Sequence, residues 1–260
     1  MKHLRNSAIL AFSVVLLSAA SLANTRTIGQ SFVYDLTVVS QASAPEGLPA
    51  SARARFDAQN GKPVAFAVTL AVDRVDSKGN GHVNGSIVSP ALAALPAFAR
   101  AAQSEFQGAL TAEGQIIPAY DPSLKPTQGP GGVLILTPAI NQNTVGGATA
   151  GLFAVFNDFA QGCGAHAAIN SRDGWRTRGG PAYARMDYTL NAGGKGSIAG
   201  HETVLVTMKG GYQEPYGSQT IVASGHYDPA QHIVVDLHVE SNSTSRNGPT
   251  SITSDFKLRS

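Results

Sequence analysis

Histidine and aspartate side chains gather in one short segment near the end of the sequence, between residues 225 and 238. They are His226, Asp228, His232, Asp236 and His238. Strand alternation would place the last three on one face, and the first two on the polar face of the preceding strand, close across a turn. Because imidazole and carboxylate groups are common ligands of divalent metals, the segment could form the metal centre of a hydrolase. Alternatively, it is the solvent-facing side of a half-buried strand, since every second residue from 233 to 239 is apolar.

The only cysteine, Cys163, lies three residues before His166. A thiol and an imidazole can act as nucleophile and base when a third group orients them, but the sequence offers no such group nearby. The alternative is that Cys163 is a small buried residue at the end of a helix. An internal disulfide is excluded, because it needs two cysteines.

Four arginines surround the only tryptophan, Trp175. They are Arg172, Arg176, Arg178 and Arg185, and only Asp173 and Asp187 balance them in this stretch. A guanidinium group beside an indole ring can bind a carboxylate or an anionic headgroup, so we predict Trp175 and Arg176 as ligand-binding residues. The alternative is that residues 162–181 form a loose loop whose arginines are simply solvated.

The signatures of several enzyme classes do not occur in the sequence. It contains no Gly-x-Ser-x-Gly elbow, no His-Glu-x-x-His pair and no phosphate loop ending in Gly-Lys-Ser/Thr. The segment Gly194-Lys195-Gly196 lies between two strand patterns and therefore predicts a turn. We assign no catalytic residue and no cofactor, and the sequence favours a non-enzymatic function.

Alternation of apolar and polar residues with a period of two dominates the chain after Asn24. The predicted strands are 28–39, 64–72, 83–88, 110–117 with a turn at 113–115, 183–190, 197–208, 219–227, 233–240 and 251–258. Turn-forming residues separate neighbouring strands at 76–81, 191–196 and 228–231. Such short connections predict an antiparallel sheet.

Two segments instead show helical spacing of apolar residues. One begins at Pro90 and continues to Leu110, and the other runs from about Thr149 to Gln161. Between them, residues 118–132 are rich in proline and glycine and predict an exposed loop. The fold class is therefore α+β, mainly β, with an antiparallel sheet and two short helices.

The first 23 residues have the pattern of a cleaved export signal. Lys2 and Arg5 precede a short apolar run at 8–17, and small residues at 21–23 predict cleavage before Asn24. The run is too short to span a membrane, so residues 24–260 are expected to form a single β-rich domain that is periplasmic or secreted and not membrane-spanning. Two of the 19 basic residues lie in the leader, which leaves 17 against 17 acidic residues. This balance argues against a nucleic-acid partner.

The order of these elements resembles that of exported bacterial proteins, many of them uncharacterised, whose antiparallel sheet curls into an open barrel partly closed by helices. Periplasmic lipoprotein carriers are the best-known members of this architecture. The resemblance depends on the hairpin at 64–88, the hinge at 112–118, the segment Asp173-Gly174-Trp175 and the closing hairpin at Asp228. It implies a curved antiparallel sheet that forms an open or half barrel, with the two short helices packed on its concave face. It also implies an apolar concavity for a hydrophobic ligand, lined by Phe98, Phe106, Leu152, Phe156 and Phe159. Alternatively, these side chains fill a closed core.

We therefore expect an exported, non-enzymatic binding or carrier protein of the bacterial cell envelope, whose partner is a hydrophobic small molecule or a lipid. Two other functions stay open. One is a metal-dependent hydrolase that uses the cluster at 226–238, and the other is a structural surface protein.

Overall fold

Eleven strands form a single antiparallel sheet in the order β5-β4-β3-β2-β1-β13-β12-β11-β10-β9-β8. The computed structural model describes residues 26–44, 46–90, 103–118, 127–128, 134–135, 145–166, 168–179, 185–214, 217–245 and 248–259. The strands of the sheet are β1 (Ser31–Ala42), β2 (Pro63–Val75), β3 (Gly81–Val88), β4 (Gln103–Leu110), β5 (Ile116–Pro118), β8 (Gly174–Gly179), β9 (Met186–Ile198), β10 (His201–Glu214), β11 (Gly217–Asp228), β12 (Ile233–Ser245) and β13 (Gly248–Leu258). Two helices, α1 (Ala50–Gln59) and α3 (Val145–Gly164), and a small pair, β6 (Thr127–Gln128) with β7 (Leu134–Ile135), complete the described elements.

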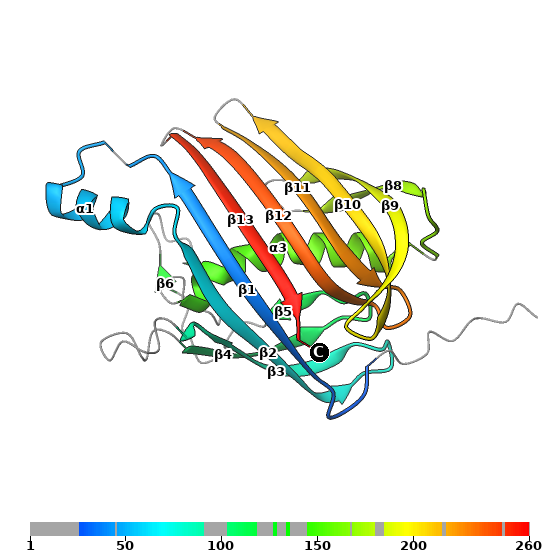
Figure 1. The fold of residues 1–260 in the computed structure, drawn as a ribbon. Helices are drawn as coiled ribbons and strands as arrows, with labels where there is room; N and C mark the ends of the chain where they lie inside the picture. The colour runs from blue at the N-terminus through cyan, green and yellow to red at the C-terminus, as the bar shows by residue number, and fades with distance from the viewer. Residues whose placement is uncertain are drawn as a thin grey trace, which may run out of the picture.

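The sheet curls around α3, which lies against its concave face (Figure 1). Its outermost strands, β5 and β8, are not paired with each other, so the described sheet is open. The predicted class, α+β with a curved antiparallel sheet, is confirmed. The second described helix, α1, was not predicted from the sequence, and it lies on the connection between β1 and β2, away from α3 (Figure 1).

The prediction of a helix from Pro90 to Leu110 is wrong over residues 103–110, because these residues form β4. Phe106 and Leu110 are four residues apart, and this spacing fits one face of a strand as well as one face of a helix. Burial alternates along β4, with Phe106, Gly108 and Leu110 buried and their neighbours more exposed. Residues 91–102, which include Phe98, lie outside the described residues, as does the predicted leader. The helix predicted at 149–161 is confirmed as the centre of α3.

Two further predictions concern the strands next to β10. Residues 191–196 were expected to form a turn, but they lie within β9, and the chain turns instead at Ala199 and Gly200. Both turn residues have positive φ, 52° and 83°, as a tight hairpin requires. Alanine seldom adopts this conformation, so the sequence gives only a weak signal there. The expected loop at 162–181 contains the strand β8, whose short alternating pattern suits the edge of a sheet.

The helix α3 contacts both outer strands of the sheet. The Asn157 side chain accepts a hydrogen bond from the Ile116 backbone N–H and donates one to the Ile116 carbonyl, both at 2.7 Å, as a neighbouring strand would. At the other outer strand, the Trp175 indole N–H donates to the Gly162 carbonyl at 2.8 Å. The helix therefore joins β5 to β8 without any strand pairing between them.

Replacing Asn157 by leucine should lower the free energy of unfolding by about 2 kcal/mol, because both backbone groups of Ile116 lose their partner. Urea denaturation measures the change. Replacing Gln161 by alanine is the control, since Gln161 is exposed on the same helix. Equal losses in the two variants would contradict the role of Asn157 as a partner of β5.

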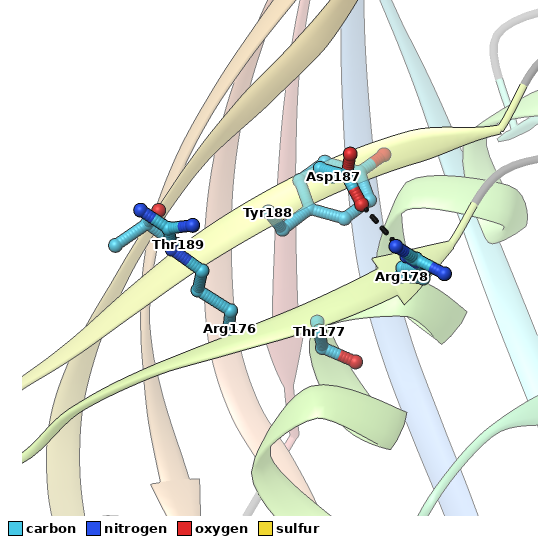
Figure 2. A pocket seen from close by; sticks show the side chains of 6 residues that line it. All are labelled: Arg176, Thr177, Arg178, Asp187, Tyr188 and Thr189. Carbon is cyan, nitrogen blue, oxygen red and sulfur yellow. Dashed lines mark hydrogen bonds and ion pairs between the residues drawn. The ribbon is translucent and has the colours of Figure 1, made fainter.

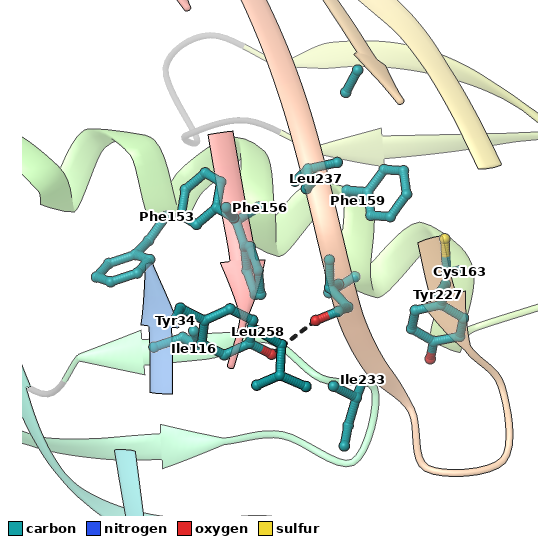
Figure 3. Close-up of a cluster of buried hydrophobic side chains, with 14 of the residues drawn as sticks. Tyr34, Ile116, Phe153, Phe156, Phe159, Cys163, Tyr227, Ile233, Leu237 and Leu258 are labelled. Carbon is teal, nitrogen blue, oxygen red and sulfur yellow. Dashed lines mark hydrogen bonds between the residues drawn. The ribbon is translucent and has the colours of Figure 1, made fainter. Parts of the chain in front are cut away.

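Aromatic side chains of α3 fill the concave side of the sheet. Phe153, Phe156 and Phe159 are all at most 2% exposed. The Phe156 ring packs edge-on against Tyr34 and at a tilt against Phe256, with ring centroids 5.6 and 5.1 Å apart. Figure 3 shows the three phenylalanine rings of α3 and Tyr34 among side chains of the sheet. The interior around α3 is thus a packed core.

At one end of the sheet, a buried arginine links two turns. Arg26 is 1% exposed, and its guanidinium group donates to the carbonyls of Gln231 and His232 at 2.7 Å and of Thr111 at 3.2 Å. Thr111 belongs to the turn between β4 and β5, whereas Gln231 and His232 belong to the turn between β11 and β12. These two turns touch, since a side chain on Gly114 would meet the His232 carbonyl oxygen at 2.4 Å. Arg26 therefore links two hairpins that are distant in the sheet order.

No helix within the described residues is long and apolar enough to cross a membrane.

Candidate anion-binding site at the β8–β9 edge

A pocket of about 370 Å³ lies where β8 pairs with β9 (Figure 2). It is lined by Arg176, Thr177, Arg178, Asp187, Tyr188 and Thr189. The antiparallel register places Arg176 opposite Thr189 and Arg178 opposite Asp187. On the exposed face of the two strands, the pocket therefore combines two guanidinium groups with one carboxylate and the Thr189 hydroxyl group.

Strand alternation decides which side chains of β8 reach this pocket. Arg176 and Arg178 are exposed, while Trp175 and Thr177, which alternate with them, are half-buried. The Trp175 ring is turned to α3 and stacks on His166, with ring centroids 4.5 Å apart. Arg176 thus lines the pocket, but Trp175 lies on the other face of β8. The structure therefore separates the two residues that we predicted to bind a ligand together.

The two arginines differ in their surroundings. The Arg178 Nε donates to the Asp187 carboxylate at 3.0 Å, and both side chains are more than three-quarters exposed. For Arg176, no carboxylate lies within ion-pair distance in the part of the chain that the structure describes. Arg176 is therefore the guanidinium group that is available to an anion from solution.

The wall of the pocket is fixed to α3 through Tyr188. Its hydroxyl group donates to the Asp158 carboxylate at 2.9 Å, and the side chain is 1% exposed. Burial raises the pKa of Tyr188 well above its usual value, and the neighbouring Asp158 raises it further. The phenol consequently stays protonated and keeps its hydrogen bond at physiological pH.

The five side chains of the predicted metal cluster belong to separate polar contacts. His226 pairs with Asp236 at 2.9 Å, and His238 pairs with Asp255 at 2.6 Å. The other two contacts are those of His232 with the Tyr227 hydroxyl and of Asp228 with His201, both at 2.9 Å. Among the described residues, no three His, Cys, Asp or Glu side chains converge as metal ligands would. The structure thus brings together only one pair of the predicted five, His226 and Asp236.

Cys163 and His166 also have different surroundings. The Cys163 side chain is fully buried in the core, where burial raises the pKa of its thiol well above the usual value. The His166 ring stacks on Trp175, and its Nε2 lies 3.7 Å from the Asp173 carboxylate. A thiol in this environment stays protonated and is a poor nucleophile.

The predicted apolar lining is placed in the packed interior wherever its side chains are described. Phe156 and Phe159 are fully buried on α3, and the Phe106 ring lies over Gly85, where a side chain would come within 2.2 Å of it. The side chain of Leu152 and the whole of Phe98 are outside the described part. Each described ring therefore contacts other parts of the protein.

The pKa values of His232 and His238 are shifted in opposite directions, so we expect the two residues to change the stability of the fold with pH in opposite ways. Burial lowers the pKa of His232, and the Arg26 guanidinium lowers it further, so the unfolded chain takes up this proton first and stability falls as the pH drops below about 6.5. The hydrogen bond to Asp255 raises the pKa of His238. The stabilisation of the folded protein by His238 is therefore fully present below about pH 6.5, and it is lost as the pH rises through the raised pKa of His238.

Urea denaturation between about pH 5 and 8 checks both signs. The His232→Asn variant should lose less stability than the wild type on acidification, and asparagine suits the positive φ of 51° at this position. The His238→Gln variant should be less stable than the wild type by under about 1 kcal/mol at low pH, since this pair is largely exposed, and the difference should shrink as the pH rises. Parallel pH curves for the wild type and both variants would contradict the assignment.

Sequence reasoning found Arg176 and Arg178 and named Asp187 as a counter-charge, but it did not pair Asp187 with Arg178 and it missed Thr189. The alternation of apolar and polar residues predicted a strand at β9. The register between β8 and β9, however, cannot be obtained from either segment alone. Arg26 was also missed, because no pattern marks a single arginine as buried.

The fold and the site together define an open antiparallel sheet with a helix in its concave face and a cationic pocket at its β8–β9 edge. No protein-family model and no curated protein matches the sequence. Among solved structures, a similar one is that of a Bacteroides fragilis protein that is presumed to be exported and has a YMCC-like fold. The two sequences are 8% identical, the alignment covers 90% of this chain and 97% of that chain, and the TM-score is 0.31. At this score the likeness assigns no function, and the resemblance to periplasmic lipoprotein carriers stays a prediction.

Proposed function

We propose that the protein is an exported, non-enzymatic binding module of the bacterial cell envelope, which holds an anionic, lipid-like ligand by its charged group at the β8–β9 edge. The observation that carries this proposal is the pocket beside Arg176, a guanidinium group without a carboxylate partner among the described residues. Arginine suits this role because its planar set of donors matches carboxylate and phosphate groups.

Two further observations support this form of the proposal. The sequence pattern of the first 23 residues is that of an export signal, which would place the mature chain among the lipids and glycolipids of the envelope. The aromatic side chains of α3 pack against the sheet, so the proposal places the ligand at the pocket instead of between α3 and the sheet.

Titration of the purified mature chain with monomeric amphiphiles tests the proposal. Laurate and dodecyl phosphate, below their critical micelle concentrations, should each bind at least ten times more tightly than uncharged dodecyl maltoside. Replacing Arg176 by glutamine should remove this preference. The matched control is Arg53→Gln, which removes the same charge from the exposed helix α1.

Equal binding of charged and uncharged amphiphiles would overturn the proposal, and so would equal losses in the two arginine variants. Native mass spectrometry of the untagged protein adds an independent measurement. An apolar molecule that stays bound after Arg176→Gln would place the ligand in the interior and contradict the edge site.

A further inference from the structure

We propose that the charged group taken up at this edge is a phosphate, held between Arg176 and Lys209 above the hydroxyl group of Thr189. This inference rests on the proposed function and adds the chemical class of the ligand and a second cationic residue. Lys209 belongs to β10, outside the pocket lining described above.

The sheet register brings these three residues into one row. Arg176 on β8 is the partner of Thr189 on β9, and Thr189 is the partner of Lys209 on β10. All three side chains are exposed, so they lie on the same outer face of three neighbouring strands. With strands about 4.8 Å apart, the two cationic residues begin roughly 10 Å from each other. Both side chains are long enough to converge above the threonine.

The nearest carboxylate does not compete for these cations. Asp187 is opposite Arg178 in the register and accepts a hydrogen bond from its Nε at 3.0 Å. On β10, the partner of Asp187 is Gly211, which carries no side chain. Across β8, β9 and β10 the row therefore has two cations, and the carboxylate beside it is already paired. The next carboxylate in the row is Glu240 on β12, two strands beyond Lys209, and it lies 3.4 Å from the His238 ring.

The shape of the donor set favours phosphate over carboxylate. A carboxylate is planar, and the fork of one guanidinium group can satisfy both of its oxygens. A phosphate is tetrahedral and can accept from three directions, here a guanidinium fork, an ammonium group and a hydroxyl group. A phosphomonoester also carries close to two negative charges at neutral pH, which matches two cations. Lys209 should therefore strengthen the binding of phosphate far more than that of carboxylate.

An apolar residue continues the row on the next strand. Val222 on β11 is the register partner of Lys209, and 41% of its surface is exposed. A phosphate on an alkyl chain could thus place its charge over Thr189 and its first methylene groups over Val222. This arrangement supports a lipid-linked phosphate as the natural ligand, although free phosphate shares the same charged group.

Calorimetric titration of the mature chain with dodecyl phosphate and laurate is the first test. We expect the Lys209→Met variant to bind dodecyl phosphate about ten times more weakly, as the loss of one charge-assisted hydrogen bond predicts, while laurate binding changes less than twofold. The matched control is Lys195→Met, an exposed lysine on β9 outside the row. Thr189→Val should weaken binding of dodecyl phosphate without removing any charge.

Two probes then distinguish the sources of the phosphate. Inorganic phosphate measures the charged group alone, and sedimentation with vesicles that contain phosphatidic acid, a lipid phosphomonoester, against pure phosphatidylcholine vesicles, measures a lipid headgroup. Binding to the phosphatidic acid vesicles that is much tighter than to inorganic phosphate, and that falls with Lys209→Met and with Val222→Ser, would support a lipid-linked phosphate. Binding of inorganic phosphate as tight as that of dodecyl phosphate would support a soluble phosphate ligand.

The outcomes separate this inference from the proposed function. If Arg176→Gln abolishes binding of both amphiphiles but Lys209→Met affects neither, the edge site stands and the phosphate assignment is overturned. Equal effects of Lys209→Met and Lys195→Met would also overturn it. If neither amphiphile binds through Arg176, the proposed function itself fails.

Discussion

Replacing Phe156 by alanine should lower the free energy of unfolding by about 3–5 kcal/mol. The ring is fully buried on α3 and contacts both Tyr34 and Phe256, so its removal leaves a cavity that the surrounding strands cannot readily close. Urea denaturation followed by tryptophan fluorescence measures the loss. Trp175 is a suitable probe because its indole N–H is bonded to α3.

The control for this variant is Phe56→Ala on α1. Phe56 is only half-buried, and its helix lies away from the core, so the expected loss is under about 1 kcal/mol. Benzene should partly restore the stability of Phe156→Ala, since dry apolar cavities of this kind bind it. A loss below about 1 kcal/mol for Phe156→Ala would mean that the interior is already hollow, which would favour a ligand beneath α3.

The second large effect is expected for Arg26→Met. Three main-chain carbonyls in two turns lose a charged donor, and the free energy of unfolding should fall by roughly 3 kcal/mol. Arg26→Lys should not restore most of this loss, because one ammonium group cannot reproduce the spread of a guanidinium fork across both turns. Thermal and urea denaturation both report the change.

Hydrogen exchange at the two turns localises the effect of Arg26→Met. Amides at 111–115 and 229–232 should lose protection first, since Arg26 joins these segments. The matched control is Arg259→Met, which removes an exposed ion pair with Asp35 and should cost under about 1 kcal/mol. Uniform loss of protection across the sheet, without a larger effect at the turns, would contradict the linking role.

The periodicity of the sequence was sufficient for most strands of the sheet and for α3, but not for β4. The hairpins on either side of 76–80 and 229–232 carry both alternation and turn residues, and the structure contains them as β2–β3 and β11–β12. The helix α3 was predicted because its apolar spacing excludes a period of two. At β4 the spacing of Phe106 and Leu110 allowed both periods, and only the pairing with β3 decides in favour of a strand.

The candidate site was predictable in part. The arginines near Trp175 suggested an anion site, and Arg176 lines the pocket. The role given to Trp175 was based on nearness in sequence, but adjacent residues of a strand point to opposite faces. Lys209 could not be connected with Arg176, since 33 residues separate them and the register of three strands is needed to bring them together.

The pairing of β1 with β13 has a consequence for biogenesis. Residues near the start of the described chain, such as Tyr34, face residues near its end, such as Leu258, in the middle of the sheet. The central ladder therefore cannot form until the last strand has been synthesised and, for an exported chain, translocated. Such long-range contacts slow folding and leave earlier strands exposed to aggregation, so a chaperone that holds the emerging polypeptide would have its largest effect on this protein before residue 248 appears.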